Sequence, residues 1–299
     1  MRFFHGEKQS GPYFEGWYFK HQNKHGQALA VIPAFHADRM GRRSASMQII
    51  TNSKSWWLEY PSSQFYAARD RFQIQIGPSS FDRRGIRMNV SAPELSLSGA
   101  LRYGPFAAVR SDIMGPFRIF AGMQCSHGVA SMRHFLEGSL CLNGEIIDFS
   151  DGVGYIETDR GRSFPDVYLW TQCVWGGPED GSVMLAAASV PLPVGSFTGC
   201  ICAIFHRGRE YRLATYLGAR LEKWSSSEAV VRQGKYRFSA ALLDGQSQPL
   251  LAPAEGGMGR TVRESLCAAV RYCFWSGKEL LFQHTDQCAS FEYSDQRRA

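Results

Sequence analysis

The sequence predicts an all-β fold. Several stretches alternate apolar and polar residues with a period of two, which is typical of antiparallel strands with one buried face. These stretches are residues 72–76, 95–98, 139–143, 211–216 and 236–240. Pairs that tolerate positive φ, such as Asn143-Gly144 and Asp244-Gly245, stand at turns between them. Aromatic residues make up 13% of the chain and there are 30 glycines, a composition that favours strands and tight turns. Many short strands with frequent turns predict a sandwich or a barrel.

The elements follow one another with few interruptions. Residues 13–20 read YFEGWYFK and predict a strand near the start, with Glu15 and Trp17 on one face and Tyr18 on the other. Residues 261–269 fit either a helix or a strand, and intrinsic propensity favours a helix. Residues 269–275 alternate again, and with 279–284 they predict a hairpin. Residues 246–259, rich in Pro and Gly, form the one linker-like stretch.

Composition excludes several classes of protein. The 299 residues suffice for two domains with real cores, and 44% hydrophobic with 20% charged residues is typical of a globular protein. The formal charge of +6 comes from scattered basic residues, without the basic face or motif of a nucleic-acid binder. The start of the chain has no apolar signal region and the stretch near 183–194 is too short to span a bilayer, so we expect a cytoplasmic protein. The eight cysteines lack the density of a disulfide scaffold, and we expect most to be reduced and buried.

Familiar catalytic and metal motifs are missing from the sequence. Gly152-Val-Gly154 lacks the third glycine and the helix of a dinucleotide site, and no P-loop or Gly-x-Ser-x-Gly elbow occurs. Cys200-Ile-Cys202 with His206 lacks the second ligand pair of a zinc site. We therefore expect neither a metal nor a cofactor.

Charged residues stand inside two aromatic stretches. Residues 154–170 read GYIETDRGRSFPDVYLW, so Glu157 and Asp159 interrupt residues that favour burial. Glu15 likewise stands among aromatic residues, and a buried acid is costly unless it is paired or neutral. A hydrogen bond from Glu15 to an arginine or the backbone would be the simplest account. For His36 and His127, which lie beside apolar residues, a satisfied core histidine is the simplest account.

Four motifs together resemble the tocopherol cyclase-like family. They are residues 13–20 (YFEGWYFK), 125–129 (CSHGV), 154–165 (GYIETDRGRSFP) and 170–173 (WTQC). The resemblance runs over most of the chain. It implies two tandem lipocalin-like (calycin) antiparallel β-barrels, at 1–150 and 151–299, with a boundary that carries a margin of about 20 residues. It also implies a hydrophobic cavity at or between the barrels for an isoprenoid or polyene chain.

Three positions differ from the family pattern. Arg160 stands where the family usually has Trp, Val174 and Trp175 stand where an Asn is expected, and Gln124 stands where related bacterial chains often have Glu. Losing the Trp and the Asn removes a stacking surface and a polar anchor from the expected site.

Plant members of this family close a prenylated hydroquinol into a chromanol ring. Such a closure needs a proton for the alkene, stabilisation of the cationic carbon and a phenol held near it. A buried, protonated acid can give the proton, and aromatic faces can stabilise the cation. We expect Asp159 or Glu157 to be the acid, with Gln172 or His127 orienting the oxygen. The expected substrate-binding residues are Glu15, Trp17, Tyr18, His36, Tyr155, Phe164 and Trp170.

Three functions follow from this interpretation. The first is a cofactor-independent intramolecular cyclase, or a hydratase-like enzyme, acting on a prenylated quinol or other polyene taken up by contact with a membrane surface. The second is a non-catalytic carrier of an isoprenoid or similar lipid, and the third is a partner-binding module with filled barrels. Ion pairs from Glu157 or Asp159 to Arg160 or Arg162 would favour the carrier, because a guanidinium lowers an acid's pKa and spoils it as a proton donor.

Overall fold

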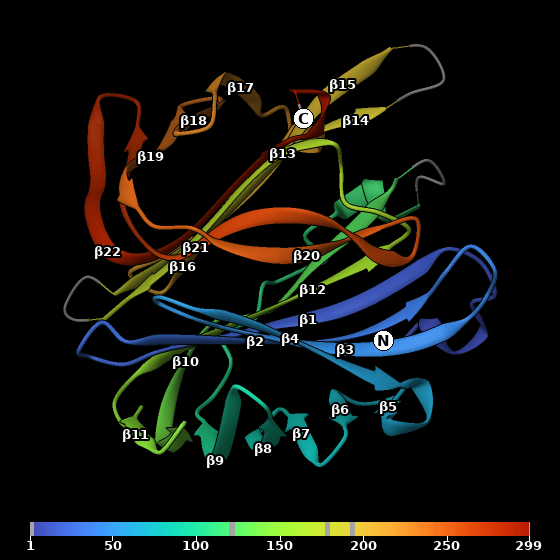
Figure 1. The fold of residues 1–299 in the computed structure, drawn as a ribbon. Helices are drawn as coiled ribbons and strands as arrows, with labels where there is room; N and C mark the ends of the chain where they lie inside the picture. Colours follow the sequence, from blue (N-terminus) through green and yellow to red (C-terminus); the bar gives the residue numbers. More distant parts are fainter. Residues whose placement is uncertain (1–2, 120–122, 177–179, 192–194, 299) are drawn as a thin grey trace.

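The computed structural model describes residues 3–119, 123–176, 180–191 and 195–298, and in these ranges the chain is nearly all β (Figure 1). The first sheet contains β1 (Tyr13–Gln22), β2 (Ala28–Ala37), β3 (Arg43–Thr51), β4 (Ser55–Pro61), β5 (Phe65–Ala67), β6 (Gln73–Ile76), β7 (Ser79–Asp82), β8 (Gly85–Ala92), β9 (Leu95–Tyr103), β10 (Cys125–Leu142), β11 (Glu145–Asp148) and β12 (Val153–Gly161). The predicted all-β fold is confirmed.

The second sheet follows in the chain. It contains β13 (Val167–Trp175), β14 (Gly181–Pro191), β15 (Ser196–His206), β16 (Arg209–Ala214), β17 (Arg220–Trp224), β18 (Glu228–Gln233), β19 (Tyr236–Gly245), β20 (Gln248–Ala254), β21 (Gly257–Ser276) and β22 (Glu279–Asp295). Short 3-10 helices stand at η1 (Gly6–Lys8), η2 (Ser62–Gln64), η3 (Gly115–Ile119), η4 (Thr215–Leu217) and η5 (Gln296–Arg298).

Both sheets are antiparallel, and each encloses its own core. In Figure 1 the second sheet, coloured yellow to red, lies above the first, coloured mostly blue to green. The order is β4-β3-β2-β1-β12-β10-β9-β8-β7-β6-β5 in the first and β16-β15-β14-β13-β22-β21-β19-β18-β17 in the second, with β11 on β10 and β20 on β21. This arrangement is consistent with two tandem lipocalin-like barrels. A third apolar cluster, which includes Tyr18, Tyr155, Trp170 and Leu250, joins residues of both sheets.

The change from one sheet to the other lies between Gly161 and Val167. β12 pairs with β1 and β10, so residues 153–161 belong to the first sheet although they follow residue 150. The division of the chain into domains near residue 150 stays a prediction. For the site, the consequence is that Glu157 and Asp159 of β12 belong to the first sheet, while Trp170 of β13 belongs to the second.

The structure decides between the two alternatives for residues 261–269, and the linker-like stretch 246–259 contains the strand β20 and the start of β21. Residues 261–269, for which propensity favours a helix, lie within the long strand β21. This strand pairs with β19, β20 and β22, so backbone pairing along most of its length overrides local propensity. The predicted hairpin after it is confirmed as β21 and β22.

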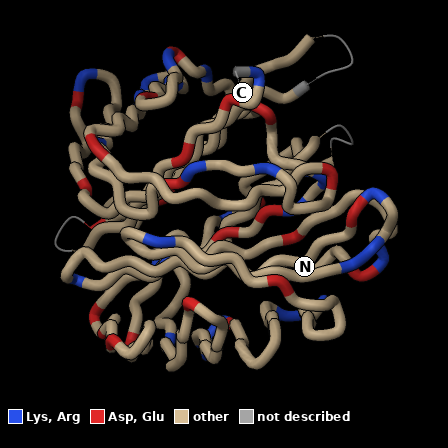
Figure 2. The backbone as a smooth tube through the Cα atoms, in the orientation of Figure 1, with Lys and Arg blue, Asp and Glu red and all other residues tan. Residues whose placement is uncertain are grey.

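The cysteines follow the sequence expectation in part, since four of the eight are both free and buried, and the charges are scattered as expected. All eight cysteines lie in the described residues; six are free, and Cys267 and Cys288 form a disulfide between β21 and β22. Figure 2 shows Lys and Arg scattered among Asp and Glu rather than gathered on one element. Over the described ranges, no helix has both the length and the apolar character needed to cross a membrane, and the cytoplasmic location stays a prediction.

Candidate functional site

A cavity of about 210 Å³ lies between the two sheets. Strands β1, β2 and β12 of the first sheet and β13, β14, β15, β20, β21 and β22 of the second contribute to its wall. Most of the lining is apolar, and the aromatic part consists of Phe14, Tyr18, Phe117, Phe164, Tyr168, Trp170 and Phe197. An apolar cavity with a few polar groups is suited to a hydrophobic small molecule.

Strand alternation decides which β1 residues reach this cavity. Phe14, Gly16 and Tyr18 line it. Trp17, on the opposite face, is 2% exposed and packs in the core of the first barrel. This division follows directly from the two-residue period of a strand.

Glu157 is a buried carboxyl on the cavity wall. It accepts hydrogen bonds from the Tyr155 hydroxyl at 2.5 Å and from Trp170 Nε1 at 3.1 Å. Burial raises the pKa of Glu157, and although His127 and the two hydrogen bonds lower it, the resulting pKa is about 8. At neutral pH this carboxyl therefore keeps its proton in an apolar environment.

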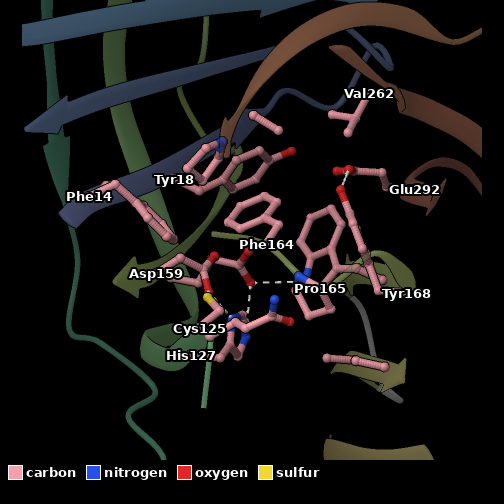
Figure 3. Close-up of a pocket in the computed structure, with 18 of the residues that line it drawn as sticks. Phe14, Tyr18, Cys125, His127, Asp159, Phe164, Pro165, Tyr168, Val262 and Glu292 are labelled. Atoms are coloured by element: carbon pink, nitrogen blue, oxygen red, sulfur yellow. Dashed lines mark hydrogen bonds and ion pairs between the residues drawn. The ribbon is translucent and has the colours of Figure 1, made fainter. Parts of the chain in front are cut away.

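Asp159 and His127 form an ion pair beside Glu157. His127 Nδ1 lies 2.9 Å from Asp159 Oδ1, and the Cys125 thiol donates to the same oxygen at 3.4 Å. His127 Nε2 lies 3.5 Å from Glu157 Oε2. Burial lowers the pKa of His127, but the electrostatic effects of Asp159 and then Glu157 outweigh it and the resulting pKa is about 9. Figure 3 shows Asp159, Cys125 and His127 together at one wall of the cavity, with Phe164 near them.

Two further glutamates reach the cavity from the second sheet. The Tyr18 hydroxyl donates to Glu264 at 2.5 Å. The Tyr168 hydroxyl donates to Glu292 (Figure 3). Burial raises the pKa of Glu264 to about 7. Burial and then the nearby Glu264 raise the pKa of Glu292 to about 8. With Tyr155 and Glu157, three glutamate–tyrosine pairs therefore surround one apolar space.

Sequence reasoning missed Glu264 and Glu292. Glu264 lies in the stretch for which propensity favours a helix, and in a helix its neighbours do not reveal whether its side chain faces the core. As a strand, residues 262, 264 and 266 share one face, and Val262 and Leu266 are buried. That parity would have predicted an inward-facing acid at Glu264. Glu292 stands between Phe291 and Tyr293, and these aromatic neighbours are a weaker indication that its carboxyl is buried.

The predicted site residues divide into two groups. The structure brings together, on the cavity wall, His127, Glu157, Asp159, Tyr18, His36, Phe164 and Trp170. Tyr155 lies next to them as the partner of Glu157. His36 Nε2 lies 2.7 Å from the Ser46 hydroxyl, and burial lowers the pKa of His36 to about 4, so its ring is neutral.

Glu15, Trp17 and Gln172 lie elsewhere, which corrects their predicted places. Glu15 faces the first barrel, where it accepts hydrogen bonds from the His5 backbone at 2.8 Å and the Tyr13 hydroxyl at 2.7 Å. Trp17 packs there too. Gln172 is 1% exposed and outside the cavity lining, and its amide atoms have no hydrogen-bond partner within the described part of the chain. Glu15 and Trp17 face away because alternation directs them to the other side of β1.

The ion pairs that would favour the carrier are not formed in the part of the chain that the structure describes. No ion pair joins Glu157 or Asp159 to Arg160 or Arg162 there, and both acids lie instead near His127. The charge that influences these carboxyls is therefore an imidazolium rather than a guanidinium.

Among the residues that the structure describes, side chains that could hold a metal occur at two places. His127, Glu157 and Asp159 place one ligand atom each within 4.8 Å of one another, and so do Cys173, His284 and Asp286 in the second barrel. In the first group, Nδ1 of His127 faces the Asp159 carboxylate and Nε2 faces the Glu157 carboxyl group, as expected of an imidazolium. This group is therefore better suited to holding a second proton on His127 than to binding a metal ion.

Comparison with known proteins identifies the architecture. No family model and no curated protein matches the chain. Among solved structures, a Nitrosomonas europaea protein assigned the name AttH aligns at 12% identity and a TM-score of 0.55, over 95% of this chain and 92% of that one. Kievitone hydratase from Nectria haematococca aligns at 11% identity and a TM-score of 0.54, over 98% and 94%. CghA with Sch210972 aligns at 11% identity and a TM-score of 0.56, over 95% and 88%.

The chain shares their fold. All three have the same tandem lipocalin-like architecture. At 11 to 12% identity the likeness establishes the fold alone, because one fold hosts many unrelated functions. The function must be argued from the cavity.

Proposed function

We propose that this protein is a cofactor-independent enzyme of the tocopherol cyclase-like type, which closes a ring in a prenylated quinol or another hydrophobic polyene by protonating an alkene. The observation that carries the proposal is Glu157: a buried carboxyl with a pKa of about 8, on the wall of an apolar cavity. A carboxylic acid that stays neutral at pH 7 in a dry site can donate a proton there. The proposed location is the cytoplasm, with substrate taken up by contact with a membrane surface.

The proposed reaction begins at Glu157. Its proton passes to one alkene carbon, and the neighbouring carbon becomes cationic. Tyr18, Phe164 and Trp170 offer aromatic faces to that cation, each worth roughly 0.5 to 2 kcal/mol. The phenol oxygen then attacks the cationic carbon, and the phenol proton returns to the carboxylate of Glu157. The product is an isomer of the substrate, so no co-reactant is needed.

His127 and Asp159 have a positioning role in this scheme. The imidazolium of His127 lies 3.5 Å from Glu157 Oε2 and stabilises the carboxylate that forms during proton transfer. Asp159 holds the ring of His127 through Nδ1 at 2.9 Å. This ion pair keeps Glu157 acidic enough to give up its proton, while burial keeps the proton on it at rest.

Two of the proteins with this fold are consistent with such chemistry. One is named a hydratase, and addition of water to a double bond can also begin with a proton transfer to carbon. Another was solved with a small molecule, Sch210972.

The experiment is to incubate the purified protein with a panel of prenylated hydroquinols and to separate the products by liquid chromatography with mass spectrometry. Wild type should form a product of unchanged mass and shifted retention. Glu157→Gln should lower the rate by about 10²- to 10⁴-fold, the usual contribution of a general acid. Asp159→Asn should lower it less, and Glu94→Gln, at an exposed position, should match wild type.

A carrier of an isoprenoid is the second candidate. The observation that favours it is that Glu157, Glu264 and Glu292 each accept a tyrosine hydrogen bond, so all three are satisfied without a substrate. If wild type converts no hydroquinol but retains one through gel filtration, the carrier replaces the enzyme. The partner-binding module required filled cores with no cavity in either barrel; the cavity described above lies between the two sheets, so it does not decide this alternative, which stays a prediction.

A further inference from the structure

A second cluster of chemically active side chains lies away from the cavity. Cys173 of β13 and His284 and Asp286 of β22 bring a thiol, an imidazole and a carboxylate within 4.8 Å of one another. None of the three lines the cavity between the sheets. Cys173 is 1% exposed and belongs to the core of the second barrel. The cluster therefore needs an explanation separate from the proposed reaction.

Asp286 occupies the centre of this cluster. Its Oδ2 lies 3.1 Å from His284 Nε2, its Oδ1 accepts the Cys288 backbone N–H at 2.6 Å, and the Cys173 thiol donates to the same carboxylate. An activated nucleophilic cysteine would have the imidazole beside the thiol as its base. Here a carboxylate lies beside the thiol, and burial, then this carboxylate, raise the pKa of Cys173 well above its ordinary value. The arrangement is not that of a nucleophile.

We propose that Cys173, His284 and Asp286 bind a divalent metal ion of the zinc type. Thiolate sulfur, imidazole nitrogen and carboxylate oxygen are the three donors that zinc takes in proteins. A thiolate disfavours Mg²⁺ and Ca²⁺, which prefer oxygen ligands. Binding breaks the S–H bond of Cys173, forms a metal–sulfur bond and releases the thiol proton to solvent. His284 binds through Nε2 and carries its ring proton on Nδ1.

Neighbouring groups already hold two of the ligands in place. Trp175 stacks on the His284 ring at 4.4 Å with an interplanar angle of 17°. The Cys288 backbone N–H fixes the Asp286 carboxylate. Groups of this kind orient metal ligands and raise affinity. The side chain of His284 is 26% exposed, so solvent reaches this edge of the cluster.

Lys20 is a charge that opposes the metal. It hydrogen-bonds to the Cys288 carbonyl at 2.7 Å and the Ser290 hydroxyl at 2.9 Å, and it interacts electrostatically with Cys173 and Asp286. A bound divalent cation is neutralised by one thiolate and one carboxylate, so Asp286 no longer compensates the charge of Lys20. Replacing Lys20 by methionine should therefore tighten metal binding.

The test is a titration of chelator-treated, dialysed full-length protein with zinc, in competition with a chromophoric chelator. We expect one equivalent per chain for wild type. With cobalt as a spectroscopic probe, a sulfur-to-cobalt charge-transfer band should appear. Cys173→Ser should lose the band, and both Cys173→Ser and His284→Gln should bind zinc at least about tenfold more weakly. Lys20→Met should bind more tightly than wild type.

Two control variants separate this cluster from other sites. Cys202→Ser removes another buried thiol of the same barrel, outside the cluster, and should retain zinc and the cobalt band. His127→Asn removes the histidine of the cavity group and should retain both as well. Circular dichroism and a thermal melt establish that each variant is folded. The proposal is overturned if wild type takes up no zinc, if folded Cys173→Ser and His284→Gln bind like wild type, or if His127→Asn is the variant that loses the metal.

Discussion

Tyr155 donates a hydrogen bond of 2.5 Å to Glu157, two residues further along the same strand. Both side chains point to the same side of β12 because a strand repeats every two residues. The hydroxyl stabilises the ionised carboxylate and lowers the pKa of Glu157, in opposition to burial. This balance sets the protonation of the proposed acid, and it can be changed by removing one oxygen atom.

Tyr155→Phe should shift the pH dependence of the reaction. Without its donor, Glu157 holds its proton to higher pH, so the alkaline limb of the kcat profile should move upward by a measurable fraction of a pH unit. Tyr66→Phe, at an exposed position, should leave the limb in place. A variant that only loosened the fold would lower the melting temperature without moving the limb, and that outcome would remove Tyr155 from the scheme.

The stability of the protein should fall as the pH rises from 6.5 to 8. Glu157, Glu292 and His127 keep protons in the folded state up to pKa values of about 8, 8 and 9, whereas in the unfolded chain their ordinary values are 4.5, 4.5 and 6.5. These groups make the folded state bind more protons in this window. Their effect outweighs the opposite contribution of His21, His36 and His134, whose pKa values burial lowers to about 4, 4 and 3, so raising the pH lowers the free energy of unfolding. Burial lowers the pKa of Lys20 to about 8, so above pH 8 the folded state loses this proton while the unfolded chain keeps it. This contribution makes the free energy of unfolding rise with pH, opposite to the effect of Glu157, Glu292 and His127.

Urea unfolding at several pH values measures this effect. Glu157→Gln removes one titrating group and should show a shallower fall than wild type, while the exposed Glu94→Gln should match wild type. A free energy of unfolding that stays constant or increases between pH 6.5 and 8 would contradict the assigned protonation states.

The aromatic ring of Trp170 should contribute to the rate of the proposed reaction. Trp170→Leu removes an aromatic face worth roughly 0.5 to 2 kcal/mol, so kcat should fall by about 2- to 30-fold. Trp170→Phe keeps an aromatic face and should be less affected, although it also loses the 3.1 Å hydrogen bond to Glu157. The measurement is the steady-state rate of each variant on one substrate that wild type converts. Equal losses in the two variants would exclude a role for the aromatic face.

Filling the cavity should abolish binding without touching the acids. Ala188 lines the cavity and is only partly buried, so Ala188→Trp places a large ring there. We expect loss of both ligand retention in gel filtration and turnover. Ala100→Trp, at an exposed position of β9, is the matched control. Unchanged turnover in a folded Ala188→Trp variant would show that the reaction occurs elsewhere.

Local pattern in the sequence predicted the all-β fold, whereas the two-barrel architecture and the acids at the cavity followed from the resemblance to the tocopherol cyclase-like family. Alternation placed the strands, and residues 154–170 placed Glu157 and Asp159 between aromatic residues that the structure buries at the cavity. The other wall could not be predicted in this way. Tyr18 meets Glu264 across 246 positions of the chain, a pairing set by how the two sheets pack.

Local pattern also did not reveal which way some polar side chains point or which residues they contact. The acid at Glu15 has the same aromatic neighbours as a cavity residue, yet it faces the interior of the first barrel and accepts a hydrogen bond from Tyr13. The partner of Asp159 is His127, 32 positions away, rather than the adjacent Arg160. Parity within a strand can be predicted from sequence, but which face of the strand meets which core depends on the packing of both sheets.

The most direct test of the central claim is the origin of the proton that reaches carbon. A hydroquinol that wild type converts should be incubated in deuterium oxide and its product analysed by mass spectrometry after the exchangeable hydrogens are washed out. The account predicts one deuterium at a carbon of the new ring in the wild-type product, and no product above background with Glu157→Gln. A product without deuterium at carbon, or the same deuterated product from Glu157→Gln at the wild-type rate, would contradict it.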